Sequence, residues 1–271
     1  MIEAKAQRRH DAAVEAGQKT YLDPATGYHV FTATTLADRG RCCGSGCRHC
    51  PFGHIGVSNP ESRRLAEGPS FRVRAQARPT GPVDVLFWSG GKDSYLTWLA
   101  LREAGRTVLW LTTFDPRYDL VAHQEVSRQA IEAQARWLDV DLLMVPLRPD
   151  RPYADVVYEG LDTVNRVTPV ARLAFGDLHL KEIRGFREQT LGPWAEPRGI
   201  ELAFPLWQVP YDALKTRLWS SKAHITLSAT PGGHGEVGQV YDARFVASLP
   251  DEIDAFGERG EFHTYVTPPS A

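Results

Sequence analysis

From residue 81 onward, short runs of β-branched and other apolar residues alternate with longer amphipathic segments. The apolar runs predict strands, and the segments in which apolar residues recur every three to four positions predict helices. Strands are expected at 83–88, 107–114, 141–146 and 171–175, and helices at 93–104, 124–138, 153–164 and 181–191. Apolar strands that alternate with helices are joined by right-handed crossovers. The pattern therefore predicts a Rossmann-like α/β domain, with a parallel sheet covered by helices on both faces and ligands at the carboxyl ends of its strands.

The first 80 residues follow a different pattern. Residues 1–17 are charged and Ala-rich and predict a helix, whereas residues 28–34 predict a short strand after a turn. Residues 58–80 are mostly Ser, Pro, Gly, Arg and Glu without an apolar period, which is typical of a linker. The expected parts are a Cys-rich N-terminal domain at 1–57, a linker at 58–80, the α/β domain at 81–204 and a smaller substrate-recognition region at 205–271.

Composition and charge narrow the class of protein. With 271 residues, 42% hydrophobic and 24% charged, the chain is expected to be globular rather than disordered or fibrous. No apolar run approaches the roughly 18 residues of a membrane helix, and residues 1–20 lack the apolar stretch of a signal peptide, so we expect a cytoplasmic protein without a membrane partner. The charge is 12 − 7 = +5 over residues 1–80 and 19 − 26 = −7 over the remainder. This asymmetry leaves a nucleic-acid partner open but does not indicate one.

Residues 89–94, with the sequence S-G-G-K-D-S, lie where the first strand of the α/β domain is expected to meet its first helix. Two glycines let an anion approach the backbone closely, and a helix N-terminus offers N–H groups and partial positive charge. Ser89, Lys92 and Ser94 add hydroxyl and ammonium donors, so the segment suits a pyrophosphate group. Its glycine spacing differs from the G-x4-G-K-[ST] loop of P-loop NTPases. The alternative is a simple Gly turn in which Asp93 caps the helix.

Three further segments complete a resemblance: F-G-D at 175–177, P-L-W at 205–207 and G-E-x-G-E-F-H-T at 257–264. With the S-G-G-K-D-S loop, they resemble the PP-loop ATP pyrophosphatases, the adenine nucleotide alpha-hydrolase superfamily, and within it the diphthine-ammonia ligase family. The resemblance covers about residues 83–266. It implies a Rossmann-like ATP domain with a substrate region after it. It also implies cleavage of ATP between its α- and β-phosphates, adenylation of a carboxylate and attack by ammonia.

The residues of these segments suit such chemistry. Asp177, directly after Gly176 at the end of an expected strand, is placed to hold Mg²⁺ or the nucleotide, and its alternative role is a helix cap. If the last segment is extended, Glu261 and His263 point to one face, and Glu258 arrives from the preceding turn. Such a cluster can hold ammonium and take up its proton. The alternative is a solvated edge strand with ordinary charges.

The cysteines form the second informative feature, because all four fall within nine residues: Cys42, Cys43, Cys47 and Cys50. This spacing predicts a local thiol site rather than a disulfide framework. The segment resembles a small domain of unknown function akin to the oxidoreductase-like domain, over about residues 21–53.

Several interpretations of these cysteines remain open. Their spacing is that of iron–sulfur ligands. Zinc is an alternative, bound by the four cysteines or with His49 or His54 replacing one. Cys47 and Cys50 also form a C-x-x-C pair that could cycle to a disulfide, and the loop could be purely structural.

The leading hypothesis for function is an ATP-dependent amide ligase that uses ATP, Mg²⁺ and ammonia or another small nucleophile on a small-molecule or protein acceptor. Nucleotide and metal are expected at Ser89, Gly90, Gly91, Lys92, Asp93, Ser94, Gly176 and Asp177. Catalysis is expected from Lys92, Asp93, Glu258, Glu261 and His263. Two alternatives are a tRNA-thiolating type of sulfurtransferase that uses the N-terminal cysteines, and a nucleotide sensor without turnover.

Overall fold

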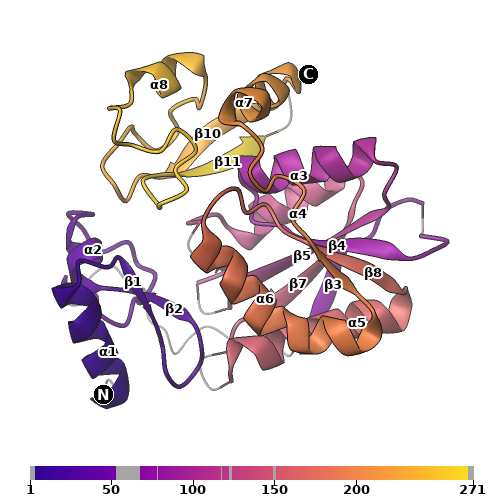
Figure 1. The fold of residues 1–271 in the computed structure, drawn as a ribbon, viewed down its shortest axis with the longest axis horizontal. Coiled ribbons are helices and arrows are strands. Elements are labelled where there is room, and N and C mark those ends of the chain that lie inside the picture. Colours follow the sequence, from indigo (N-terminus) through magenta and orange to yellow (C-terminus); the bar gives the residue numbers. More distant parts are fainter. Residues whose placement is uncertain are drawn as a thin grey trace.

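The computed structural model describes residues 4–52, 68–77, 79–116, 118–121, 124–148 and 151–267. A central sheet has the strand order β3-β7-β5-β4-β8-β9, with β6 paired to β5 (Figure 1). Its strands are β3 (Ser70–Val73), β4 (Val83–Phe87), β5 (Val108–Asp115), β6 (Leu120–Val121), β7 (Asp141–Pro146), β8 (Val170–Ala174) and β9 (Glu201–Ala203). Strands β4, β5, β7, β8 and β9 run parallel, and β3 and β6 pair antiparallel. The predicted parallel α/β sheet is confirmed.

Helices cover both faces of this sheet (Figure 1). Helices α3 (Lys92–Glu103) and α4 (Arg128–Trp137) lie on one face, and α5 (Tyr153–Val167) and α6 (Lys181–Ala195) lie on the other. The side chains of β4 alternate accordingly: Leu86 packs with the α3 and α4 side, whereas Val83 and Val85 pack with the α5 and α6 side. Burial on both faces explains why the strands read as apolar runs in the sequence.

The chain order places a binding crevice at the end of β4. From β4 the chain continues to β5 and β7 on one side, and then crosses to β8 and β9 on the other side. Ligands of such sheets bind outside the carboxyl ends of the strands, where the order reverses. Residues 89–94 follow β4 after Trp88, so they lie at this crevice.

After β9, the C-terminal residues fold back over the α3 side of the sheet (Figure 1). The elements after β9 are α7 (Tyr211–Ser220), β10 (His224–Ala229), α8 (Ala243–Ser248) and β11 (His263–Thr267). A short 3₁₀ helix, η2 (Glu196–Arg198), precedes β9. Strands β10 and β11 form a separate antiparallel pair. Tyr241, Phe256 and Phe262 belong to the same buried cluster as Leu86 and Leu96. The predicted substrate region therefore shares a hydrophobic core with the α/β domain.

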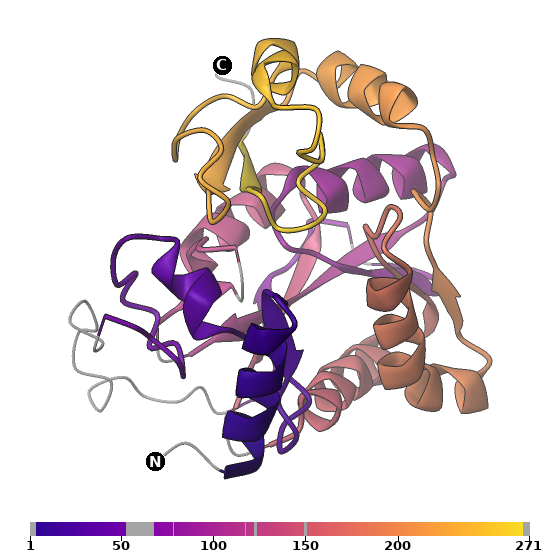
Figure 2. The ribbon, with the colours of Figure 1, turned by 60° about the vertical axis from the view of Figure 1, so that its left-hand side comes forward.

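The N-terminal unit, residues 4–52, lies beside the sheet and comes forward in Figure 2. It consists of α1 (Ala4–Glu15), the antiparallel strands β1 (Thr20–Leu22) and β2 (His29–Phe31), and α2 (Ala33–Ala37). The segment that follows, residues 41–51, carries the four cysteines and is called the cysteine loop below. Its apolar cluster contains only Ala6, Ala13 and Tyr21, with Val30 packed against it. This unit therefore has a much smaller core than the α/β domain.

Several local predictions differ from the structure, and the helices predicted to end at 164 and 191 extend to Val167 and Ala195. The segment predicted as a linker contains β3, which adds an edge strand to β7, and the part of that segment at 58–67 lies outside the described residues. Helix α4 begins at Arg128 rather than at 124, because the Ser127 side chain caps it by accepting the Ala130 N–H. The predicted strand at 28–34 ends early, since Thr32 caps α2. Within the described residues, no helix is long and apolar enough to cross a membrane.

Candidate functional site

The loop of residues 89–94 requires glycine at two positions. Gly90 has φ +88°, and a Cβ atom there would lie 2.6 Å from Ile131 Cδ1. A Cβ atom on Gly91 would lie 3.0 Å from the Thr264 carbonyl oxygen. Larger residues would thus push the loop away from α4 and from β11, so the glycines fix its close packing.

Two serines hold the curvature of this loop. Ser89 Oγ accepts a hydrogen bond from the Gly91 N–H at 3.4 Å and donates to Ser94 Oγ at 3.3 Å. Ser94 Oγ in turn donates to the Gly91 carbonyl oxygen at 2.9 Å. The loop is therefore shaped by its own hydroxyl groups at the point where α3 begins.

Strand β11 covers the loop directly. Thr264 Oγ1 accepts a hydrogen bond from the Lys92 N–H at 3.0 Å, across 172 positions of sequence. The Val266 N–H donates to the Gly90 carbonyl oxygen at 3.0 Å. The C-terminal motif and the glycine loop thus form one structural unit.

Gln134 of α4 connects the loop, β11 and the end of β4. It is almost fully buried, and its Nε2 donates to the carbonyl oxygens of Gly90 at 2.9 Å and Val266 at 2.6 Å. Its Oε1 accepts the Trp88 indole N–H at 2.8 Å. Nothing in the sequence distinguished Gln134, because a single Gln in an amphipathic helix is ordinary.

The Lys92 ammonium is buried and turned toward the C-terminal region. Its Nζ donates to the Phe256 carbonyl oxygen and pairs with Asp93 Oδ2 at 3.0 Å. The rings of Tyr241, Phe256 and Phe262 lie between 5.2 and 5.8 Å from it. Cation–π contacts and the carboxylate together compensate this buried charge.

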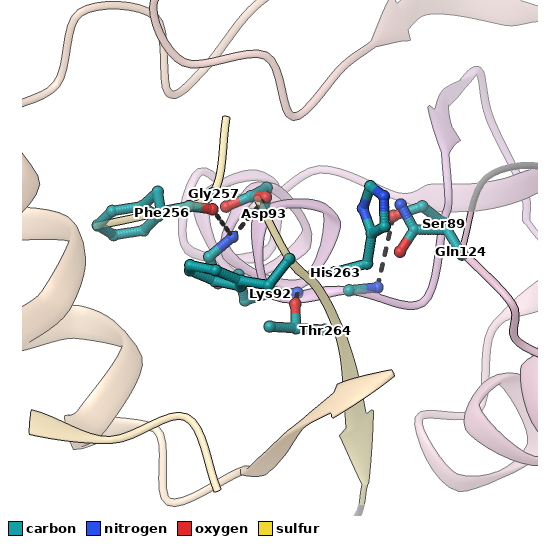
Figure 3. A pocket seen from close by; sticks show the side chains of 10 residues that line it. Ser89, Lys92, Asp93, Gln124, Phe256, Gly257, His263 and Thr264 are labelled. Carbon is teal, nitrogen blue, oxygen red and sulfur yellow. Dashed lines mark hydrogen bonds and ion pairs between the residues drawn. The ribbon is translucent and has the colours of Figure 1, made fainter. Parts of the chain in front are cut away.

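These groups line a small polar pocket (Figure 3). Figure 3 shows His263 beside Ser89 and Gln124, on the side of the pocket away from Phe256. The lining residues are Ser89, Gly91, Lys92, Asp93, Gln124, Phe256, Gly257, Phe262, His263 and Thr264. The pocket therefore joins the predicted phosphate loop to the C-terminal motif, and Gln124 is a lining residue that the sequence did not reveal.

Carboxylates gather beside the pocket. Asp93 Oδ1 and Asp177 Oδ2 are buried without a hydrogen-bond partner in the described part of the chain, although Arg187 Nε lies 3.5 Å from Asp177 Oδ2. Gly176 brings the two segments together, since a Cβ atom there would lie 3.0 Å from the Asp93 backbone. Burial raises the pKa of Asp93, while the Lys92 ammonium opposes this shift. Asp93, with one oxygen free of hydrogen bonds, and Asp177, whose carboxylate pairs with Arg187, fit Mg²⁺, which takes one or two carboxylates together with phosphate oxygens and water.

Glu258 belongs to the same acidic group. Its Oε2 accepts the His179 N–H at 3.2 Å. Burial, and next the negative charge of Asp93, raise the pKa of Glu258 to about 7, although the His179 hydrogen bond and Lys92 act in the opposite direction. A carboxyl group with such a pKa can exchange a proton near neutral pH.

Glu261 does not line the pocket beside His263, although the alternation of side chains along an extended segment had predicted that both point to one face. It is buried, and its carboxylate accepts the backbone N–H groups of Arg259 at 3.0 Å and Asp254 at 3.4 Å. It therefore holds the turn that carries Glu258 rather than lining the pocket. Its predicted catalytic role stays a prediction, and the geometry favours a positioning role.

The N-terminal unit docks on loops at the carboxyl ends of the strands. The Arg39 guanidinium pairs with Glu125, next to the pocket residue Gln124, at 3.2 Å. Gly46 packs so tightly on Tyr118, in the same loop region, that a Cβ atom there would overlap the phenol oxygen. Further contacts are Tyr153 N to Thr26 O (2.8 Å), Tyr28 Oη to Arg148 O (3.0 Å) and Lys19 Nζ to Arg259 O (3.1 Å). The cysteine loop consequently lies close to the candidate site.

The cysteines are half-buried thiols in two close pairs. Cys50 Sγ lies 3.8 Å from Cys42 Sγ, and Cys47 donates a hydrogen bond to Cys43. That bond, together with Ser45 and the Arg39 charge, lowers the pKa of Cys43 to about 4 against the effect of burial, and the same bond raises the pKa of Cys47. As the side chains stand, no group of three or more His, Cys, Asp or Glu among the described residues is arranged to hold a metal ion.

Comparison with known protein families finds a match for the N-terminal segment. Residues 9–56 match the model of a family of unknown function (DUF5522). This agrees with the prediction of a Cys-rich domain of unknown function. A crystal structure described as a predicted subunit of tRNA methyltransferase from Methanocaldococcus jannaschii is similar at 16% identity, over 70% of this chain and 100% of that chain, with a TM-score of 0.34. At this TM-score the similarity carries no functional argument.

Proposed function

We propose that this protein is an ATP-dependent ligase that adenylates a carboxylate, releases pyrophosphate and forms an amide with ammonia. The observation that carries the proposal is the shared pocket of two distant segments, the S-G-G-K-D-S loop and residues 256–264. Both carry motifs that resemble the diphthine-ammonia ligase family of the PP-loop ATP pyrophosphatases. A passive nucleotide sensor would not need an acid, an imidazole and a buried lysine around the phosphate loop.

The loop is proposed to bind the phosphates of ATP. Gly90 and Gly91 allow close approach of the anion, Ser89 and Ser94 supply hydroxyl groups, and the N-terminus of α3 supplies partial positive charge. Lys92, in the same loop, adds a positive charge. Asp93 and Asp177 would hold Mg²⁺, which when bound stabilises the charge of the departing pyrophosphate.

The proposed reaction has two steps. A carboxylate oxygen of the acceptor attacks the α-phosphorus, and the bond to pyrophosphate breaks. Ammonia then attacks the acyl carbon, and AMP leaves. Ammonia arrives mostly as ammonium, so a base must accept its proton, and Glu258 with a pKa of about 7 suits this role while His263 lies in the pocket.

Product analysis tests this proposal. The wild-type chain, supplied with ATP, Mg²⁺, ammonium and a panel of carboxylic acids, is expected to form AMP and pyrophosphate in amounts equal to the amide. Asp93→Asn should reduce pyrophosphate release by at least about a hundredfold, since it removes a charge next to Lys92 and the phosphates. The matched control is Asp212→Asn, because the Asp212 side chain is 93% exposed on α7.

The outcomes separate the candidate functions. Formation of ADP and phosphate, or normal pyrophosphate release by Asp93→Asn, would contradict the proposal. If the chain binds ATP but forms no product with any of the carboxylic acids, the nucleotide sensor without turnover would be favoured.

A sulfurtransferase is the second candidate, and the docking of the cysteine loop beside Glu125 and Gln124 favours it. The charge of −7 over residues 81–271 disfavours a tRNA substrate. Replacing ammonium by a persulfide donor distinguishes the two, because only the sulfurtransferase would give a thiolated product that depends on Cys43 and Cys47.

A further inference from the structure

Within the cysteine loop, the sulfur atoms of Cys42 and Cys50 lie at the distance that separates two ligands of one metal ion. Two thiolates on one tetrahedral ion with metal–sulfur bonds of about 2.3 Å are separated by about 3.8 Å. Cys42 Sγ and Cys50 Sγ lie 3.8 Å apart, and Cys43 and Cys47 are hydrogen-bonded to each other. Each pair is therefore close enough to share one metal ion.

The surroundings of the sulfur atoms suit an anionic thiolate centre. Arg39 Nη1 lies 3.5 Å from Cys43 Sγ, and Ser45 donates both its N–H and its hydroxyl to the same sulfur. Gly44 and Gly46 have φ values of +81° and +64°, which turn the backbone around the thiols. Hydrogen bonds to ligand sulfur are a common outer shell of metal–thiolate sites.

The small core of the N-terminal unit provides an independent argument. Among its described residues, the buried apolar side chains are Ala6, Ala13, Tyr21 and Leu36, and the buried polar ones are His10, Asp23, Thr26, Thr32, Thr35 and His49. More polar than apolar side chains are thus buried. A unit of about 50 residues with so little apolar burial needs a cross-link or a metal for stability.

We propose that Cys42, Cys43, Cys47 and Cys50 together bind a thiophilic metal through four thiolates, as a zinc ion or as the iron of an iron–sulfur cluster. Binding of Zn²⁺ by four thiolates releases to solvent the protons of those cysteines that are still thiols. In the structure, no three cysteine sulfurs surround one point. Metal binding therefore requires the cysteine side chains to rotate until both pairs contact the same ion. This inference does not rest on the proposed ligase function.

His49 is not a metal ligand in this proposal, although its position between Cys47 and Cys50 made it a candidate zinc ligand. Its Nε2 is hydrogen-bonded to Tyr21 Oη at 2.7 Å, and its ring stacks on His10 at 3.8 Å. The side chain is part of the small core. His54 lies outside the described residues.

Metal analysis of the full chain, purified without oxygen, tests the proposal. We expect about one zinc ion per chain, or iron with an equal amount of acid-labile sulfide and visible charge-transfer absorption. Either result supports the thiolate centre, and the two results distinguish its forms. Cys47→Ser and Cys50→Ser should each lower the metal content at least about tenfold, whereas Arg41→Gln, an exposed position next to Cys42 with all four thiols present, should retain it.

A second measurement covers the case in which a cysteine variant does not fold. Chelator-treated wild-type chain is titrated with Co²⁺, and the ligand-field and thiolate charge-transfer bands of tetrahedral cobalt are expected to appear at about one equivalent. Absence of these bands together with less than about a tenth of an equivalent of metal in the wild type would overturn the proposal. So would normal metal content in Cys47→Ser, or an intact mass that shows disulfides in the anaerobic protein.

Discussion

At the scale of single residues, the fold changes the acid–base chemistry of Glu258 most clearly. Burial and the neighbouring Asp93 raise its pKa to about 7, whereas a glutamate in an unfolded chain titrates near about 4.3. The folded state therefore binds this proton more tightly than the unfolded state does. The stability that Glu258 contributes is fully present below its ordinary pKa, and it is lost as the pH rises through about 7.

Glu258→Gln is expected to remove this pH dependence. Between about pH 5 and pH 8, the free energy of unfolding of the wild type should fall by about 2 kcal/mol more than that of the variant. Urea unfolding at each pH measures the difference. Glu252→Gln is the control, because Glu252 is exposed in the same C-terminal segment. Equal pH profiles for Glu258→Gln and wild type would mean that Glu258 is ordinary.

At the scale of elements, the site depends on the contact of α4 and β11 with the loop after β4. Gln134 makes three hydrogen bonds there, to Trp88, Gly90 and Val266. Tyr265 Oη makes one bond between the same two elements, to the Ala130 carbonyl oxygen at 3.2 Å. Of these two residues, Gln134 is hydrogen-bonded to the glycine loop and Tyr265 is not. Variants of the two residues therefore distinguish positioning of the loop from attachment of β11 to α4.

Gln134→Met keeps the side-chain volume but removes three buried hydrogen bonds, to the Trp88 indole N–H and to the carbonyl oxygens of Val266 and Gly90. Of these partners, the Gly90 carbonyl keeps a second donor, the Val266 N–H. Gln134→Met should lower the free energy of unfolding by about 2–4 kcal/mol, and Tyr265→Phe by about 0.5–1.5 kcal/mol. If the loop binds ATP as proposed, calorimetry should show at least about tenfold weaker ATP binding for Gln134→Met and near-normal binding for Tyr265→Phe. Equal ATP affinities in the two variants would show that Gln134 does not position the loop.

At the scale of the whole molecule, the two parts of the chain have unequal cores. The α/β domain and the C-terminal region share extensive apolar clusters, whereas the N-terminal unit relies on polar groups such as the stacked His10 and His49. Burial, and next the charge of His10, lower the pKa of His49 to about 4. The folded state therefore disfavours protonated His49, and the stability that this group contributes is present above about pH 6.5 and is lost as the pH falls toward 4.

The N-terminal unit is expected to loosen first in acid. Hydrogen exchange should show protection factors in residues 4–52 that fall at least about tenfold, or about 1.4 kcal/mol, between about pH 7 and pH 4.5, relative to amides of β5. His49→Gln should reduce this fall, and His224→Gln should not, because His224 is exposed. A parallel loss of protection in both parts of the chain would contradict this expectation.

The positions of strands and helices could be predicted where burial imposes a period. Strands β4, β5, β7 and β8 are apolar on both faces, so their sequences mark them without reference to anything else. Strand β3 has only one buried residue, Val73, and exists because β7 offers a free edge. An edge strand of this kind is stabilised by its pairing with a neighbouring strand rather than by its own apolar residues. For this reason the sequence of residues 58–80 predicted a linker and not a strand.

The sequence by itself determined the α/β domain, the glycine loop at the end of β4 and the local clustering of the thiols, because each depends on residues that are neighbours in the chain. Only the tertiary structure decided that β11 lies on the glycine loop, that Glu261 holds a turn while the pKa of Glu258 rises, and that Arg39 of the N-terminal unit pairs with Glu125, next to the pocket residue Gln124. Contacts across 172 positions, and the burial that shifts a pKa, arise from packing between elements. A pattern along one chain carries no information on which distant surfaces will meet.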